Sequence, residues 1–511
     1  MQRMKKLTII LGDHPLAGDL VRQCRRLGRE VEHHADLAWA VDMTRCGELV
    51  LLSAGDDDRV LARLHELALA CPDPDTDGPA AGDPRVLCHL VVSHDSTLQM
   101  LHQCDLDPDI TAKMDVYPTA MHEVWSRQLV LDRQPITLAS DRRVHLVLFG
   151  MGEMARAVAI HAALVAHYPN YVRDHSLRTR VTVIAPGATT AMADWTACYR
   201  HLFDNSYYRL VNPSLEHGVL QLHRPTYEGR REDFVDVEWE WVDATVAHPV
   251  VQDKLTQWSR DPRQLLTVVM AGEDCRMNIA DAMQLPDAVL DGGIPVHVYL
   301  RDDTLLRTVR LQGRYSGLHP FGMLDRGYDI TLPWVRMARV VNHIYDQFYQ
   351  ANAEHLHDEC WQMRYAVEVD PVARDAAWAR LPAVKRQSSI CNALTVATKL
   401  RSIGLRDDEW DQFYDITQRD MELLAQVEHN RWSVAQLILG YRPCTDNEQQ
   451  MLERDISLKP SLKSRMVHYD LRAYADLRPD ETGKSVAVYD LCLCAALPLI
   501  AKSFVQDSAR P

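Results

Sequence analysis

Short apolar runs separated by amphipathic stretches fill the first part of the chain. Leu7–Leu11 is the first run, and a glycine-containing turn and an amphipathic stretch up to Leu27 follow it. Similar runs recur at Glu48–Ser53 and Val86–Val92. Strands that alternate with helices form parallel sheets. The pattern therefore predicts a divergent Rossmann-like domain over residues 1–140.

A second and clearer series of strands and helices begins at Val144. Helical patterns at Glu153–His167 and Met277–Met283 separate some of the strands, and the long mixed gap Tyr199–Asp233 suggests an elaborated connection. The expected strands are Val144–Phe149, Arg180–Ala185, Val235–Val242, Leu265–Ala271 and Pro295–Leu300. We expect a second Rossmann domain over residues 141–310, in tandem with the first.

The pattern changes to long helical stretches after residue 310. Residues 311–370 are expected to form a helical connector, and residues 371–511 a mostly α-helical domain. The expected helices are Leu332–Asn352, two within Pro371–Leu405, Met421–Leu439 before Gly440, and one near Lys484–Leu497. The fold class predicted for the whole chain is α/β, with tandem Rossmann-like doubly wound parallel sheets followed by this helical region.

Composition narrows the function classes. The 511 residues include 56 Lys and Arg and 71 Asp and Glu, a net charge of −15, which argues against broad nucleic-acid binding. No apolar run reaches the roughly 20 residues of a membrane helix, so direct membrane insertion is not expected. The 12 cysteines are scattered without a Cys-x-x-Cys pair, as in reduced cytoplasmic proteins.

Metal chemistry has little support in the sequence. His355, His357 and Cys360 are close together, but no second cluster completes a site. Cys492 and Cys494 lie in an apolar stretch and are expected to pack in the core.

The sharpest local motif is Gly150-Met-Gly152-Glu153-Met154-Ala155, which follows a predicted strand and opens a predicted helix. Gly150 permits a tight turn, Gly152 lets backbone approach a phosphate, and Ala155 allows close packing of helix on strand. The helix N-terminus attracts an anion. The motif predicts binding of NAD(P) or another adenine nucleotide.

Two departures weaken dinucleotide binding. The second strand ends at Ala185, where an acid usually holds the ribose. In the first domain His14 replaces the second glycine and would crowd a pyrophosphate, although Asp36 lies near the ribose position. The first domain is therefore expected to be structural or dimer-forming.

Polar residues also follow the later strands. Asp243 and Thr245 come after the third strand and could bind a base or ribose, or cap a helix. Gly272 follows the fourth strand and is expected to contribute to cofactor binding, and Glu273 and Asp274 form either a carboxylate pair or a helix start. No catalytic residues are predicted, because a nucleophile elbow, a Walker lysine loop and a His-Glu-x-x-His motif are all absent from the sequence.

The segment from Val144 to about Arg310 resembles a TrkA-N (KTN) domain, the Rossmann module of potassium-channel and transporter regulators. The resemblance rests on the glycine motif, Val242–Thr245, Val268–Asp274 and Val296–Asp303. It implies that the glycine turn holds phosphates and that Asp243–Thr245 borders the nucleotide.

The C-terminal region resembles the ryanodine-receptor (RyR) repeat domain. The matching residues are Glu428-His429-Asn430-Arg431-Trp432, Gly440-Tyr441-Arg442, Leu458–Leu462, Tyr469–Leu471 and Ser388–Leu400. Arg431 and Arg442 would bind an anionic ligand and Trp432 or Tyr441 would stack on it, with Glu428 orienting an arginine or accepting from a base. The aromatic residues could equally be core residues.

These features favour a nucleotide-sensing regulator that acts as a homodimer on a separate effector or channel subunit. Bacterial proteins that join the two modules are associated with antiviral or nucleotide signalling. The alternatives are an NAD(P)-dependent oxidoreductase with a helical substrate domain and a scaffold whose nucleotide pocket is vestigial.

Overall fold

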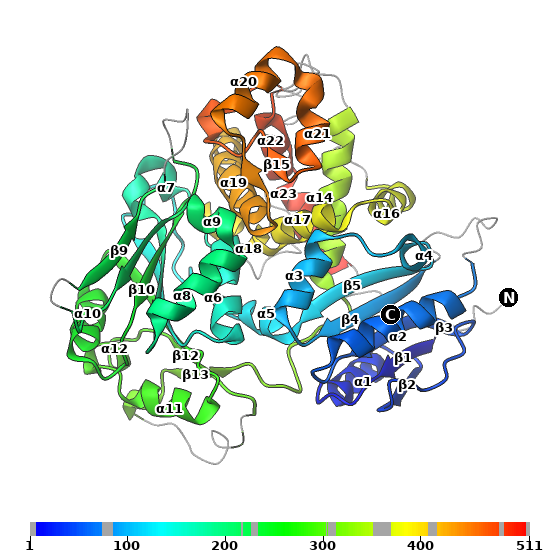
Figure 1. Cartoon of the computed structure of the whole chain (residues 1–511), viewed down its shortest axis with the longest axis horizontal. Helices are drawn as coiled ribbons and strands as arrows, with labels where there is room; N and C mark the ends of the chain where they lie inside the picture. The colour runs from blue at the N-terminus through cyan, green and yellow to red at the C-terminus, as the bar shows by residue number, and fades with distance from the viewer. Residues whose placement is uncertain are drawn as a thin grey trace.

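The chain forms two parallel sheets and a helical region (Figure 1). The computed structural model describes residues 7–73, 85–215, 218–225, 233–302, 304, 313–350, 369–406, 416–479 and 485–506. The α/β fold class with parallel sheets followed by helices is confirmed. In Figure 1 the two sheets lie side by side, and the helical region lies across the top of both.

The first sheet has five parallel strands in the order β2-β1-β3-β4-β5. The strands are β1 (Leu7–Leu11), β2 (Val31–His34), β3 (Cys46–Leu52), β4 (Val86–Val92) and β5 (Met114–Ala120). The helices are α1 (Ala17–Arg26), α2 (Asp57–Ala70), α3 (Asp95–Gln103), α4 (Pro108–Thr111) and α5 (Met121–Ser126). This is the flavodoxin-like order rather than the Rossmann order. The two domains predicted in tandem therefore share a doubly wound architecture but not a strand order.

The second sheet has eight strands in the order β13-β12-β11-β6-β7-β10-β8-β9. Its first six positions reproduce the Rossmann order, with β6 as the first strand. The strands are β6 (Arg143–Phe149), β7 (Thr179–Ile184), β8 (Tyr207–Val211), β9 (Val219–His223), β10 (Val237–Val242), β11 (Gln264–Met270), β12 (Val296–Tyr299) and β13 (Leu318–Phe321). Only β9 runs antiparallel in the described sheet.

Helices connect these strands as the apolar pattern predicted. They are α6 (Glu153–Val165), α7 (Asn170–Arg173), α8 (Ala188–Cys198), α9 (Arg200–Asp204), α10 (Pro249–Arg260), α11 (Cys275–Met283) and α12 (Asp287–Leu290). The expected elaborated connection at Tyr199–Asp233 contains α9, β8 and β9. Strand β13 lies beyond the expected boundary at residue 310, inside the expected helical connector, because its four residues are too few to show a period.

The helical region begins at α14 (Pro333–Gln350). It continues with α16 (Pro371–Ala379), α17 (Ala383–Leu394), α18 (Val396–Ser402), α19 (Gln418–Ile438), α20 (Asp446–Arg454), α21 (Lys459–Lys463), α22 (Ala487–Ala495) and α23 (Leu497–Gln506). The short strands β14 (Arg442–Pro443) and β15 (Val467–His468) pair in parallel. Thr417 and Asp420 form a capping box that fixes the start of α19.

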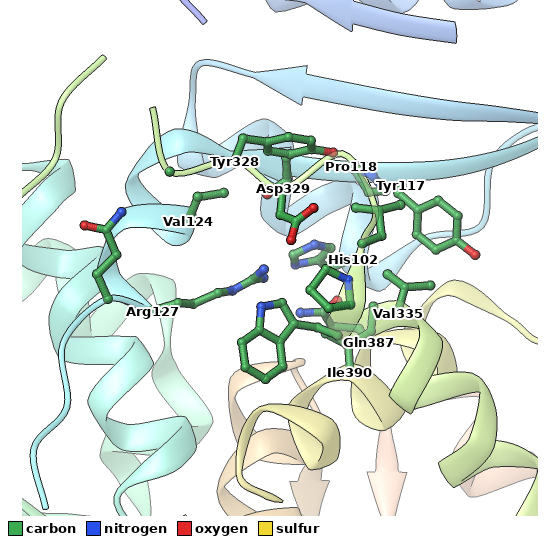
Figure 2. A pocket seen from close by; sticks show the side chains of 16 residues that line it. His102, Tyr117, Pro118, Val124, Arg127, Tyr328, Asp329, Val335, Gln387 and Ile390 are labelled. Atoms are coloured by element: carbon green, nitrogen blue, oxygen red, sulfur yellow. The ribbon is translucent and has the colours of Figure 1, made fainter. Parts of the chain in front are cut away.

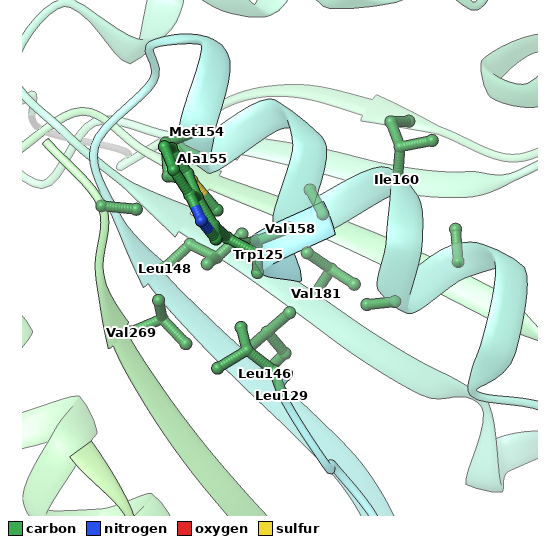
Figure 3. Close-up of a cluster of buried hydrophobic side chains, with 14 of the residues drawn as sticks. Trp125, Leu129, Leu146, Leu148, Met154, Ala155, Val158, Ile160, Val181 and Val269 are labelled. Carbon is green, nitrogen blue, oxygen red and sulfur yellow. The ribbon is translucent and has the colours of Figure 1, made fainter. Parts of the chain in front are cut away.

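One hydrophobic interior connects the three parts. Its buried residues include Ile10 in the first sheet, Leu146 in the second and Val434 on α19. Trp125 on α5 packs beside Met154 and Ala155 of α6 (Figure 3). Its indole N–H also donates to the Arg326 carbonyl at 2.9 Å. The parts therefore bury apolar surface against one another.

Ten cysteines in the described part of the chain are free thiols. Cys492 is disulfide-bonded, so the expectation of reduced thiols is wrong at that position. Cys492 and Cys494 are buried, as expected for core residues. No helix within the described ranges has the length and apolar character needed to cross a membrane.

Candidate functional site

The glycine motif lies at the carboxyl edge of the second sheet, where β6 is flanked by β7 and β11. The chain leaves β6 toward β7 on one side, and β11 lies on the other, so this is a topological switch point. Gly150 has a φ of +118°, and a Cβ there would lie 2.7 Å from the Ala271 carbonyl oxygen. Only glycine fits this turn without strain.

A carboxylate occupies the space beside Gly152. Oε1 of Glu273 accepts a hydrogen bond from the Glu153 amide at 3.0 Å, at the N-terminus of α6. A Cβ on Gly152 would be only 1.6 Å from the same oxygen. The Glu273 side chain therefore stands where the glycine motif would place a phosphate of a ligand.

The loop that carries Glu273 is fixed by Asn278 on α11. Asn278 Oδ1 accepts from the Gly272 amide at 2.8 Å, and its Nδ2 donates to the Gly272 and Tyr299 carbonyls at 2.9 and 3.1 Å. Glu273 itself is exposed. Its backbone is therefore held while its carboxylate is able to swing into solvent.

Met154 and Ala155 face inward, away from the anion position (Figure 3). Glu153 is partly exposed beside His94 and His122, each with a ring nitrogen 3.9 Å from its carboxylate. The turn of the motif thus provides backbone amides that can bind an anion. The helix of the motif contributes Met154 and Ala155 to the core.

Asp243 lies beside the end of the second strand, β7. Its carboxylate accepts from the Gly187 amide at 2.8 Å and from the amide and hydroxyl of Thr189 at 3.1 and 2.5 Å. Burial opposes ionisation, but these Thr189 and Gly187 hydrogen bonds outweigh it and lower the pKa of Asp243. Asp243 therefore caps α8 from the neighbouring strand. Thr245 is exposed at the start of the next turn.

The predicted RyR-like residues are divided between a buried cluster and a surface pair. Glu428 accepts two hydrogen bonds from Arg431 and one from Asn392, and its other partner is the Lys399 ammonium at 2.6 Å. Burial opposes ionisation, but Arg431 and Lys399 outweigh it and lower the pKa of Glu428 to about 2. Asn430 is also buried.

Arg442 is partly exposed and forms two hydrogen bonds of 2.7 Å to Glu448. Trp432 and Tyr441 both pack edge-on against His468, with ring centroids 4.8 and 5.7 Å away. The structure brings these two aromatic residues together, but each predicted anion-binding arginine already has a carboxylate partner.

A cavity between the three parts had no signal in the sequence. It measures about 220 Å³ and is lined by residues from α3, β5, α5, the segment before α14, and α17 (Figure 2). Its residues come from distant segments, so local spacing could not reveal it.

Among the described residues, no group of three His, Cys, Asp or Glu side chains is placed to hold a metal ion. His355, His357 and Cys360 lie outside the described residues. Comparison of the chain with protein-family models, curated proteins and solved structures finds no match.

Proposed function

We propose that the protein is a nucleotide-sensing regulator that binds a phosphate of NAD(P) or another adenine nucleotide at the N-terminus of α6. The observation that carries the proposal is the Glu273 carboxylate on the Glu153 amide at 3.0 Å. An intramolecular anion at this position is evidence that the exposed amides of the helix attract negative charge. The ligand phosphate would replace it.

The cost of that replacement is small, because Glu273 is exposed and regains its hydration when it leaves. By contrast, a ligand at Arg431 would have to break a fully buried ion cluster. The glycine turn is therefore the better ligand site of the two that the sequence suggested.

Regulation would act through α6, which contacts α5 of the first part and α17 and α19 of the helical region. A ligand changes the arrangement of these parts only if it binds two arrangements with different affinity. The proposal includes a homodimer and a separate effector or channel subunit, with a role in antiviral or nucleotide signalling, as the TrkA-N and RyR resemblances imply.

The position of the Glu273 carboxylate also favours a second candidate function, that of a scaffold. In a scaffold, the Glu273 side chain would close the phosphate position. The two candidates differ in what happens when the charge of Glu273 is removed. A sensor then binds nucleotide more tightly, whereas a scaffold binds none before or after the change.

The test is calorimetric titration of the full chain with ATP, ADP, AMP, NAD(H), NADP(H) and ADP-ribose. For a nucleotide that binds, Glu273→Gln should lower the dissociation constant about tenfold, or roughly 1.4 kcal/mol, because a like charge is removed. Gly152→Asp should abolish binding by adding a fixed carboxylate there.

Asp274→Asn is the matched control. The Asp274 carboxylate accepts from the Arg276 amide at 2.9 Å and caps α11 instead of α6. This variant should bind like the wild type. Absence of binding in both the wild type and Glu273→Gln would reject the sensor in favour of the scaffold.

A further inference from the structure

The cavity at the junction of the three parts presents one cation and one anion. Figure 2 shows Arg127 and Asp329 pointing into it from opposite elements. No ion pair joins the two side chains, although both belong to the described residues. Arg127 is paired with Glu123 on one side only, and its remaining edge and the Asp329 carboxylate can each bind a ligand group.

Arg127 comes from the first part of the chain. One of its terminal nitrogens donates to Glu123 at 2.7 Å, and its buried Nε has no hydrogen-bond partner within the described structure. Glu123 holds one edge of the guanidinium and so fixes its orientation. A guanidinium fixed in this way suits a carboxylate ligand, which accepts parallel hydrogen bonds from it.

Asp329 comes from the segment before α14. Its Oδ1 accepts from the amide and hydroxyl of Thr331 at 2.8 and 2.7 Å, which fixes the carboxylate in a local turn. The residue is exposed, so it stands at the mouth of the cavity. No cation among the described residues pairs with it. Its second oxygen is therefore available to an ammonium group.

The remaining wall is apolar where the helical region contributes to it. Val335 and Ile390 line the cavity, with Gln387 beside them (Figure 2). His102 adds no further cation, because burial lowers the pKa of its ring. A cavity of 150 Å³ already admits benzene, so about 220 Å³ is enough for a small molecule with one apolar side group.

We propose that this cavity binds a free α-amino acid with an apolar or aromatic side chain. Its carboxylate would contact Arg127, its ammonium group Asp329, and its side chain Val335 and Ile390. A zwitterion offers a carboxylate to the remaining edge of Arg127 and an ammonium group to Asp329 at once, whereas a nucleotide phosphate would be repelled by Asp329. This ligand is separate from the nucleotide at α6, and the proposal does not depend on that site.

Amino-acid binding would join the three parts. Arg127 belongs to the first part, Asp329 follows the last strand of the second sheet, and Ile390 lies on α17. One bound molecule that contacts all three stabilises their association. The protein would then respond to amino-acid supply through its domain arrangement.

The experiment is calorimetric titration of the full chain with each of the twenty standard L-amino acids. At least one apolar or aromatic amino acid should bind. For that amino acid, the amine that lacks the carboxylate and the acid that lacks the ammonium group should each bind at least tenfold more weakly. Absence of binding by all twenty, or equal binding of a singly charged analogue, would overturn the proposal.

Two variants test the contacts. Asp329→Asn keeps an acceptor for Thr331 but removes the charge, and Arg127→Lys keeps a cation opposite Glu123 but removes the planar fork. Each should weaken binding about tenfold or more. Asp325→Asn removes a nearby exposed charge outside the cavity and should leave the affinity unchanged. Wild-type affinity in Asp329→Asn would overturn the proposed contact and with it the site.

Discussion

Glu428 and Arg431, three residues apart on α19, form two hydrogen bonds of 2.8 and 2.7 Å with each other. Both side chains are at most 2% exposed. Two residues that the sequence suggested for ligand binding thus neutralise one another inside the helical region. Lys399 adds a second buried cation to the same carboxylate.

Glu428→Gln should strongly destabilise the protein. The variant removes the carboxylate that directly contacts the buried Arg431 and Lys399, which costs about 3–5 kcal/mol. Urea denaturation followed by circular dichroism would measure the loss. Glu453→Gln, which removes one partner of an exposed ion pair with Arg478, should leave the midpoint near the wild-type value. A stable Glu428→Gln protein would contradict the structural role of this cluster.

The Glu428 carboxylate also makes the free energy of unfolding depend on pH in the acid range. The pKa of Glu428 is about 2 in the folded protein and near 4.5 in the unfolded chain. Its contribution is therefore fully present above about pH 4.5 and is lost as the pH falls toward 2, roughly 3 kcal/mol in all. Unfolding free energies measured between pH 6 and pH 3 should fall more steeply for the wild type than for Glu428→Gln. Parallel curves would show that Glu428 does not contribute.

The two glycines of the motif should respond differently to alanine. Gly150→Ala forces a side chain into a left-handed conformation and against the Ala271 carbonyl, and should cost about 1–3 kcal/mol or more. Gly152→Ala meets only the flexible end of Glu273, which can move away. Thermal unfolding of both variants tests this, and equal melting temperatures would contradict the geometry.

Asp115 on β5 should hold the helical region on the first sheet. Its carboxylate contacts Arg85, Arg339 and Arg386, with nitrogen–oxygen distances of 3.4, 2.7 and 2.9 Å. Asp115→Asn leaves three arginines without this charge and should cost about 3–5 kcal/mol. The helical region should then separate from the first sheet more often. Limited proteolysis should therefore cut the variant sooner than the wild type. Asp109→Asn, an exposed change on α4, is the control.

Apolar runs were sufficient to predict the central strands but not the edges of the sheets. Strand β2 reads Val-Glu-His-His and shows no apolar run, because it lies at the sheet edge and none of its four residues is buried. Strand β5 was not predicted either; it contains Pro118 and lies at the sheet edge, where proline is tolerated.

The candidate site could be predicted from the sequence only where its residues are close together in the chain. The turn at Gly150 follows from consecutive residues, since strand, turn and helix are adjacent in the chain. Glu273 lies 120 residues beyond Glu153, and Asp243 reaches α8 from another strand. Only the topology of the sheet brings these groups together. Asn278 carried a weak signal, because asparagine disfavours a helix interior unless its side chain has a specific partner.

The burial of Trp125 also bears on how the chain matures during synthesis. Its indole packs on α6 and donates to the Arg326 carbonyl, so about 200 further residues must leave the ribosome before that environment exists. Until then the nascent first part would expose a large aromatic surface. Such surfaces promote aggregation and chaperone capture. Translation beyond residue 326 would therefore precede release of the first part from chaperones.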